Sequence, residues 1–148
     1  MKFYIGSDHA GYDTKEKLQR YLQRKGIETV DLGAHSKERV DYPDFAQKVA
    51  KKVAKDKGSF GLLVCGTGIG MSMAANKVKG IRAANPFDSY TAKKAREHND
   101  ANIICLGGRS YDARRASSIL GAFISAKPGK EKRHKARVAK IMKLEKKQ

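Results

Sequence analysis

A cysteine followed by three alternating glycines is the feature of the sequence with the clearest chemical potential. Cys65 ends an apolar run, and Gly66, Gly68 and Gly70 follow it at every second position. Because glycine has no Cβ, the backbone N–H groups of such a loop can converge on one anion. A helix expected to begin near Gly70 adds unpaired donors and the positive end of its dipole. The pattern therefore predicts a potential thiolate beside an anion site, and Thr67 adds a hydroxyl to this glycine loop (residues 66–70).

The spacing of these glycines differs from that of the standard nucleotide-binding motifs. A P-loop spacing is absent, and the dinucleotide-binding spacing fails because Met71 and Met73 stand where its third glycine should be. The glycines alone leave two interpretations open: an anion-binding loop, or a turn that lets a helix pack closely on a strand. Cys65 favours the first, because it lies beside the loop. Cys105 lies within an apolar run and is expected in the core.

The elements that must position these residues alternate between strands and helices. Apolar periodicity and turn residues predict strands over residues 2–7, 27–32, 60–65, 81–85 and 101–106. They predict helices over 13–25, from Pro43 until Gly58, and over 70–78, 86–97, 113–124 and 131–146. This order predicts a single domain over residues 1–148, built as a three-layer α/β/α sandwich. Its sheet should be five-stranded, parallel and Rossmann-like, with an extra C-terminal helix in the basic tail over about 131–148.

The predicted topology places several polar residues at one edge of the sheet. Ligands of such folds bind beyond the carboxyl ends of the strands. Asp8 and His9 follow the first strand, Cys65 ends the third, and Arg109 follows the fifth. His98 is expected in a loop before the fifth strand, and so at the opposite edge. Within one chain His98 is not expected to reach Cys65, which suggests a site shared between two chains.

The charge of the chain is strongly positive and unevenly distributed. The net charge is +17, and residues 127–148 carry ten Lys or Arg and two acids, or +8. Such charge attracts either nucleic acid or a phosphorylated small molecule, or simply makes a lysine-rich soluble surface. Aromatic residues make up 7% and do not alternate with the basic ones, so a nucleic-acid partner is not expected.

The cysteines and the apolar segments exclude other classes of protein. Two cysteines without metal-type spacing predict reduced thiols, no disulfide framework and no metal site. There is no run of 18 apolar residues, and the segment after Met1 turns polar at once, unlike a signal peptide. We therefore expect no membrane partner and a cytoplasmic location.

Six motifs taken together resemble the type B ribose-5-phosphate isomerases, a family that also includes galactose-6-phosphate isomerase subunits and allose-6-phosphate isomerases. The resemblance covers nearly the whole chain, in order and at matching spacing. The motifs are Asp8-His9-Ala10-Gly11, Asp41-Tyr42-Pro43, Cys65-Gly66-Thr67-Gly68-Ile69-Gly70, Ala74-Ala75-Asn76-Lys77, Gly80-Ile81-Arg82-Ala83 and His98-Asn99-Asp100.

The resemblance implies interconversion of ribose 5-phosphate and ribulose 5-phosphate through a 1,2-enediolate, with no metal or other cofactor. It also implies a homodimer, or a dimer of dimers, with active sites shared between chains. By position, Cys65 matches the general base and His98 the ring-opening acid, while Thr67 and Asp8 join them as catalytic candidates. The matching substrate-binding set is Asp8, His9, Gly66, Thr67, Gly68, Ile69, Gly70, Asn99, Arg109, Arg133 and Arg137.

Two positions qualify the resemblance. One branch of the family has a glutamate base where this chain has Met71, which cannot accept a proton, so the chain resembles the cysteine branch. The segment over residues 130–132 departs from the family, which usually has glycines before the Arg133 position. Arg133 and Arg137 are four apart and thus share a helical face that can bind a phosphate dianion. The alternatives are an isomerase of a six-carbon sugar phosphate and, more distantly, a polyanion-binding protein.

Overall fold

The sheet consists of five strands, all parallel, in the computed structural model, which describes residues 1–145. The strands are β1 (Lys2–Ser7), β2 (Glu28–Asp31), β3 (Phe60–Cys65), β4 (Ala83–Ala84) and β5 (Ile103–Gly107). Their spatial order is β2-β1-β3-β5-β4. β3 is therefore the central strand, and its carboxyl end holds Cys65 between the ends of β1 and β5.

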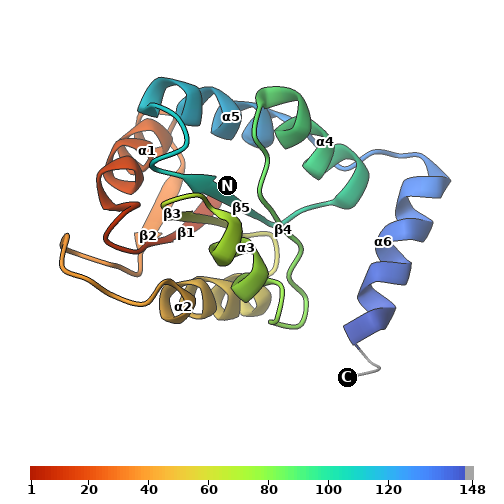
Figure 1. Cartoon of the computed structure of the whole chain (residues 1–148). Coiled ribbons are helices and arrows are strands. Elements are labelled where there is room, and N and C mark those ends of the chain that lie inside the picture. The colour runs from red at the N-terminus through yellow and green to blue at the C-terminus, as the bar shows by residue number, and fades with distance from the viewer. Residues whose placement is uncertain (146–148) are drawn as a thin grey trace.

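Helices cover both faces of the sheet (Figure 1). They are α1 (Tyr12–Arg24), α2 (Tyr42–Lys55), α3 (Ile69–Ala75), α4 (Ser89–Asn99), α5 (Ala113–Ser125) and α6 (Lys132–Leu144). The buried side chains of α1, α4 and α5 pack on one face, and those of α2 and α3 pack on the other. The three-layer α/β/α architecture predicted from the sequence is therefore confirmed.

Strand residues alternate between the two apolar layers. In β1, Phe3 and Ile5 join the layer of α1 and α5, whereas Tyr4 joins the layer of α2. In β3, Val64 faces the first layer and Cys65 the second. A strand buried on both faces is mostly apolar, which is why β1 and β3 were predictable to the residue.

The C-terminal helix α6 lies apart from the sheet and packs against α4 (Figure 1). It begins at Lys132 and ends at Leu144. The predicted end of this helix at residue 146, and the tail over residues 146–148, lie outside the described residues.

Several predicted boundaries were wrong around β4 and α4. β4 is only two residues long, because side chains replace the backbone ladder on either side of it: the Arg82 N–H donates to Asn102 Oδ1, and Asn85 Nδ2 donates to the Cys105 carbonyl. α4 begins at Ser89 instead of Pro86, since the Asp88 carboxylate and Thr91 form a capping box there. The helix also extends through His98 and Asn99, which were expected in a loop.

Candidate active site

Cys65 is buried at the carboxyl end of β3, with a backbone donor directed at its sulfur. Its side chain is 5% exposed, and the Gly68 N–H donates to Cys65 Sγ at 3.1 Å. Gly68 has a left-handed backbone (φ 81°), and a Cβ there would lie 2.4 Å from Asn85 Nδ2. Glycine is thus required at this position, and its N–H is available to solvate a thiolate.

The rest of the glycine loop is fixed by contacts with neighbouring segments. The Gly108 N–H donates to the Cys65 carbonyl at 2.7 Å, and the Arg109 N–H donates to the Gly66 carbonyl at 3.0 Å. A Cβ on Gly70 would lie 2.5 Å from the Tyr42 ring, so the aromatic ring lies directly against the loop. These contacts hold the loop in one conformation beside the cysteine, with the Arg109 backbone next to it.

Inside the glycine loop, Thr67 and Ile69 lead into α3. The Ile69 N–H donates to Thr67 Oγ1 at 3.2 Å, and α3 begins at Ile69. The Ile69 side chain is largely exposed, in contrast to Met71, which is fully buried in the core. Met71 therefore faces away from solvent, at the position where part of the resembled family has its base.

Asp8 and His9 lie beyond the end of β1, at the same edge as Cys65. The Asp8 carboxylate accepts a hydrogen bond from the Gly11 N–H at 2.9 Å, which fixes the turn into α1 and uses one of its two oxygens. His9 Nδ1 accepts from the Val40 N–H at 3.4 Å, so in the neutral ring the proton lies on Nε2. His9 also lines a cavity of about 340 Å³ together with Arg39, a cation that sequence reasoning missed.

A buried lysine supports the loop that covers this edge. Lys15 is fully buried in α1, and its Nζ donates to both Asp31 carboxylate oxygens at 2.9 and 2.7 Å and to the Ala34 carbonyl at 2.7 Å. Sequence reasoning also missed this residue. The available signal was its position: Lys15, Leu18 and Leu22 are spaced by three and four residues, which places the lysine on the apolar face.

A second group of candidate residues surrounds the end of α4. The His98 ring stacks on the His134 ring of α6, with centroids 4.1 Å apart and planes at 8°. His134 is buried, and its Nε2 has no hydrogen-bond partner among residues 1–145. Both rings line a cavity of about 320 Å³. Sequence reasoning missed His134, because only the return of α6 onto α4 brings it beside His98.

Arg133 and Arg137 are exposed on α6 near this pair of histidines, and Asn99 follows His98 at the end of α4. Arg133 already binds Glu131, with Nε 2.6 Å from the carboxylate. The charged residues that line the cavity between α4 and α6 are Glu97, Asp100 and Lys135, while the arginines lie outside its lining and Arg133 is partly neutralised by Glu131.

The two groups are not brought together within one chain. Cys65 pairs in register with Gly107 at the end of β5, whereas His98 precedes the first residue of that strand, Ile103. Four residues of strand span about 13 Å, and this is only part of the separation. One chain therefore places Cys65, the glycine loop, Asp8, His9 and Arg109 at the carboxyl edge, and His98, Asn99, Arg133 and Arg137 at the opposite edge.

The burial of His134 predicts a pH-dependent stability. Burial lowers the pKa of His134 below its ordinary value of 6.5, and the neighbouring His98 lowers it further. Between the folded-state and unfolded-state pKa values of His134, the unfolded chain binds more protons than the folded one. The stability that comes from burying a neutral His134 is therefore complete above about pH 6.5 and is lost as the pH falls below it. We expect His134→Gln to flatten the decrease in Tm between pH 7.5 and pH 5.5. Removing the exposed His35 by His35→Gln is the control, and equal pH slopes for wild type and His134→Gln would contradict the prediction.

The described residues also bear on metals and membranes. Within residues 1–145, His, Cys, Asp and Glu side chains form no cluster of three or more that could hold a metal ion. Both cysteines are free thiols, and Cys105 is in the core as expected. None of the helices described for residues 1–145 has the length and apolar character needed to cross a membrane.

The fold and the carboxyl edge of the sheet are those of an α/β enzyme. Its parallel sheet places a cysteine and a loop of backbone amides beyond the ends of the strands. A model of the family described as Ribose/Galactose Isomerase matches residues 3–141, and the chain belongs to this family. Its relatives and structural neighbours are sugar-phosphate isomerases, and this chain is a sugar-phosphate isomerase as well.

The similarity extends over whole chains. The ribose-5-phosphate isomerase B of Escherichia coli is 40% identical over 144 residues, which cover 97% of this chain and 96% of the relative. A solved structure of the Clostridium thermocellum ribose-5-phosphate isomerase B has a TM-score of 0.96 at 48% identity and covers 99% of both chains. That of Trypanosoma brucei type B ribose 5-phosphate isomerase has a TM-score of 0.93 at 49% identity and covers 97% of both chains.

Proposed function

We propose that this enzyme interconverts ribose 5-phosphate and ribulose 5-phosphate, with Cys65 as the general base. The observation that carries the proposal is the hydrogen bond from the Gly68 N–H to the buried Cys65 sulfur. It combines a nucleophilic atom with an amide donor at the sheet edge where such folds bind ligands. Full-length similarity to enzymes named as ribose-5-phosphate isomerase B supports the choice of substrate.

In the proposed reaction, the Cys65 thiolate removes the proton from C2 of the open-chain aldose. The electron pair of that C–H bond forms a C1–C2 double bond and displaces the carbonyl π pair onto O1, which gives a 1,2-enediolate. The hydroxyl proton of O2 then moves to O1, and C2 becomes the carbonyl carbon as Cys65 returns its proton to C1 to give the ketose. Amides of the glycine loop stabilise the negative oxygen, and each such donor typically contributes about 3–4 kcal/mol in the transition state. The Thr67 hydroxyl supplies a further donor beside the same oxygen.

Ring opening must precede this step, because ribose 5-phosphate is cyclic in solution. An acid protonates the ring oxygen while a base takes the proton from O1. His98 is suited to be the acid near neutral pH, and Asp8 orients the sugar hydroxyls or a histidine at the other end. Because His98 and Cys65 are at opposite edges of one sheet, His98 acts in the site of a second chain.

A homodimer with shared sites follows from this assignment. Large apolar side chains are exposed beside the glycine loop and on the elements that carry the second group: Ile69 and Met73 on α3, Phe87 and Tyr90 near the start of α4, and Ile141 and Leu144 on α6. We assign this surface to a second copy of the chain, because His98, the proposed ring-opening acid, lies at the opposite edge of the sheet from Cys65 and can reach that site only from a partner.

The phosphate of the substrate is assigned to His9, Arg109 and the two arginines of α6. Arg137→Ala should reduce kcat/KM by about 10- to 150-fold, since a charge-assisted hydrogen bond contributes roughly 1.5–3 kcal/mol. Arg133→Ala should have a smaller effect, because Arg133 must first leave Glu131. Steady-state kinetics with ribose 5-phosphate measures both.

The control separates a local clamp from general basicity. Lys51, Lys52 and Lys55 are exposed on α2, and replacing all three with glutamine removes three charges away from α6. If the total positive charge of the chain attracted the substrate, that attraction would be screened by salt and would depend on these lysines as much as on the arginines. If the triple variant loses more activity than Arg137→Ala, the clamp assignment is wrong.

A six-carbon sugar phosphate is the second candidate substrate, because the matching family model is described as Ribose/Galactose Isomerase. Steady-state isomerisation of the phosphates of ribose, allose and galactose, measured side by side, decides between the two. We expect the highest kcat/KM with ribose 5-phosphate. A higher value with either six-carbon substrate would reject the proposed substrate and leave the chemistry of Cys65 in place.

A further inference from the structure

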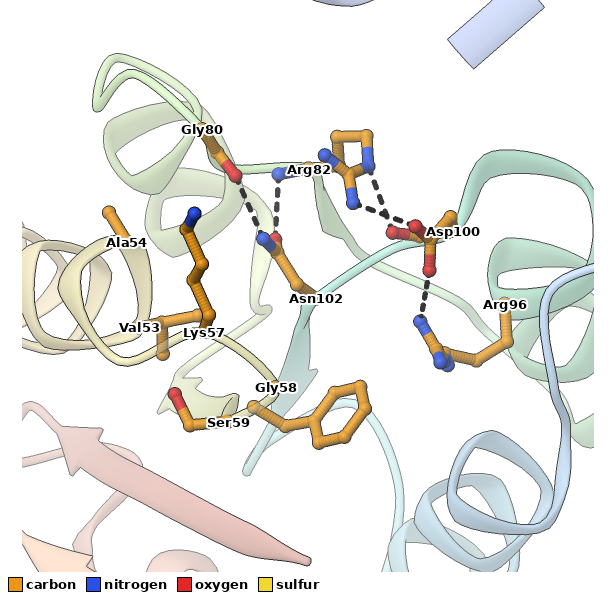
Figure 2. A pocket seen from close by; sticks show the side chains of 11 residues that line it. Val53, Ala54, Lys57, Gly58, Ser59, Gly80, Arg82, Arg96, Asp100 and Asn102 are labelled. Carbon is orange, nitrogen blue, oxygen red and sulfur yellow. Dashed lines mark hydrogen bonds and ion pairs between the residues drawn. The ribbon is translucent and has the colours of Figure 1, made fainter. Parts of the chain in front are cut away.

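Two arginines share one carboxylate at the turn that ends α4. Asp100 follows the helix in a left-handed backbone conformation (φ 46°). Its Oδ1 accepts from Arg96 Nη1 at 2.8 Å, and its Oδ2 accepts from Arg82 Nη2 at 3.1 Å (Figure 2). The last carbonyls of a helix have no partner inside the helix, so a turn of this kind depends on outside donors. His98 is two residues before Asp100, inside that last turn.

Arg96 anchors the turn to the core. Its side chain is buried against two aromatic rings that contact each other edge to face, with the guanidinium carbon 4.7 Å from the Phe60 centroid and 5.6 Å from the Phe123 centroid. Besides Asp100, its Nη1 donates to the Ala101 carbonyl at 2.7 Å. Arg96 therefore fixes Asp100 against the body of the protein.

Arg82 anchors the same turn to the edge of the sheet. Its Nε donates to the Asp100 carbonyl at 2.9 Å and to the Asn99 carbonyl at 3.2 Å. Its own N–H donates to Asn102 Oδ1 at 2.8 Å, next to β5 (Figure 2). The Arg82 side chain thus supplies donors to two carbonyls of the turn and one charge to its carboxylate.

Arg82 also reaches α6. Its Nη1 donates to Met142 Sδ at 3.3 Å, and α6 carries the His134 ring on which His98 stacks. One side chain is therefore bonded both to the end of the helix that holds His98 and to the helix that holds its stacking partner. Arg82 lies far from Cys65: the next residue, Ala83, pairs with Ile103 at the start of β5, whereas Cys65 lies beside the end of that strand.

We propose that Arg82, acting through Asp100, is a positioning residue that orients His98 for ring opening and has no part in proton transfer at Cys65. This inference rests on the proposed function. Removing the guanidinium leaves the Asn99 and Asp100 carbonyls without their side-chain donor and Asp100 with one cation instead of two. The last turn of α4 then loosens, and the imidazole that depends on it loses its orientation.

The chemistry of the two sugars separates ring opening from proton transfer. Ribose 5-phosphate must be opened before Cys65 can act. Ribulose 5-phosphate is already open, because its O5 carries the phosphate and no remaining hydroxyl can form a stable ring with C2. In deuterium oxide, removal of a C1 proton from ribulose 5-phosphate and return of a solvent deuteron to C1 exchange that position without any ring opening. The exchange therefore reports on Cys65 and the glycine loop alone.

The experiment compares isomerisation of ribose 5-phosphate with deuterium exchange at C1 of ribulose 5-phosphate. We expect Arg82→Leu to lower kcat for ribose 5-phosphate about tenfold or more, since a positioned acid contributes roughly 10²–10⁴ in rate. The exchange rate should stay within about twofold of wild type, because the base in that step is untouched. Arg82→Lys, which keeps the charge but not the planar fork, should recover part of the loss.

Two further variants control for folding and for charge. Asp100→Asn keeps the size of the side chain and should produce the same selective loss. Arg24→Leu removes an exposed arginine at the end of α1 and should change neither rate. Equal losses in both assays for Arg82→Leu and Asp100→Asn, or no loss in either assay, would overturn the inference.

His98→Ala distinguishes this inference from the proposed function. If His98→Ala loses isomerisation selectively and Arg82→Leu does not, the positioning role alone is wrong. If His98→Ala reduces both rates equally or neither, then His98 is not the ring-opening acid and the proposed mechanism itself fails.

Discussion

Replacing Cys65 with alanine is expected to reduce kcat by at least about 100-fold, because a positioned general base contributes roughly 10²–10⁴ in rate. The variant should remain folded, since the substitution removes a single buried sulfur and leaves the glycine loop with its contacts to Gly108 and Arg109. Steady-state isomerisation and a thermal unfolding curve measure the two expectations. Wild-type turnover in a folded Cys65→Ala protein would exclude Cys65 as the base.

Cys105 supplies the matched control for this experiment. It lies in β5, on the layer that also buries Cys65, and it is fully buried. Burial raises the pKa of the Cys105 thiol well above its ordinary value, and the neighbouring Cys65 raises it further, so Cys105 remains protonated near neutral pH. Cys105→Ala should therefore keep kcat near the wild-type value. Loss of turnover in this variant as well would indicate that packing around the thiols, rather than a base, had been removed.

The fold was predictable from the sequence where burial alone decides the structure. β1 and β3 have the predicted bounds, because each is built on a short apolar run between polar turns. The errors lie where side chains compete for the backbone. Pro86 predicted the start of α4, but the capping box of Asp88 and Thr91 sets it three residues later. Its end was missed because Asp100, with no glycine to mark it, adopts the left-handed conformation.

The position of Cys65 beside a glycine loop was likewise predictable, because strand, cysteine and loop are contiguous in the sequence. His134, Arg96 and Lys15 were not. A histidine in a basic tail and charged residues on helices are usually solvated, and their burial depends on contacts between distant elements. The Arg96 guanidinium lies against two aromatic rings from β3 and α5, and Lys15 reaches Asp31 at the end of β2. The local periodicity of the sequence cannot predict contacts with such distant partners.

The separation of Cys65 from His98 leads to the prediction with the largest change in measured activity. Cys65→Ala and His98→Ala chains should each be nearly inactive towards ribose 5-phosphate, yet a mixture of the two should be active. In a hybrid dimer, one of the two sites combines an intact Cys65 from one chain with an intact His98 from the other, and the second site has neither. Random pairing makes half of the dimers hybrid, so equal amounts should recover about one quarter of the wild-type specific activity.

The decisive control replaces the His98→Ala chain with one that carries both substitutions. Mixed with Cys65→Ala, this chain offers no intact Cys65 to any site, so no recovery is expected. Chains with different affinity tags show by co-purification that subunits have exchanged. If exchange is complete and the first mixture still has no activity, then both groups act within one chain, and α4 must bring His98 to Cys65 around the edge of the sheet. Recovery near one quarter would require that each site take its base from one chain and its acid from the other, which the opposite edges of a single parallel sheet demand.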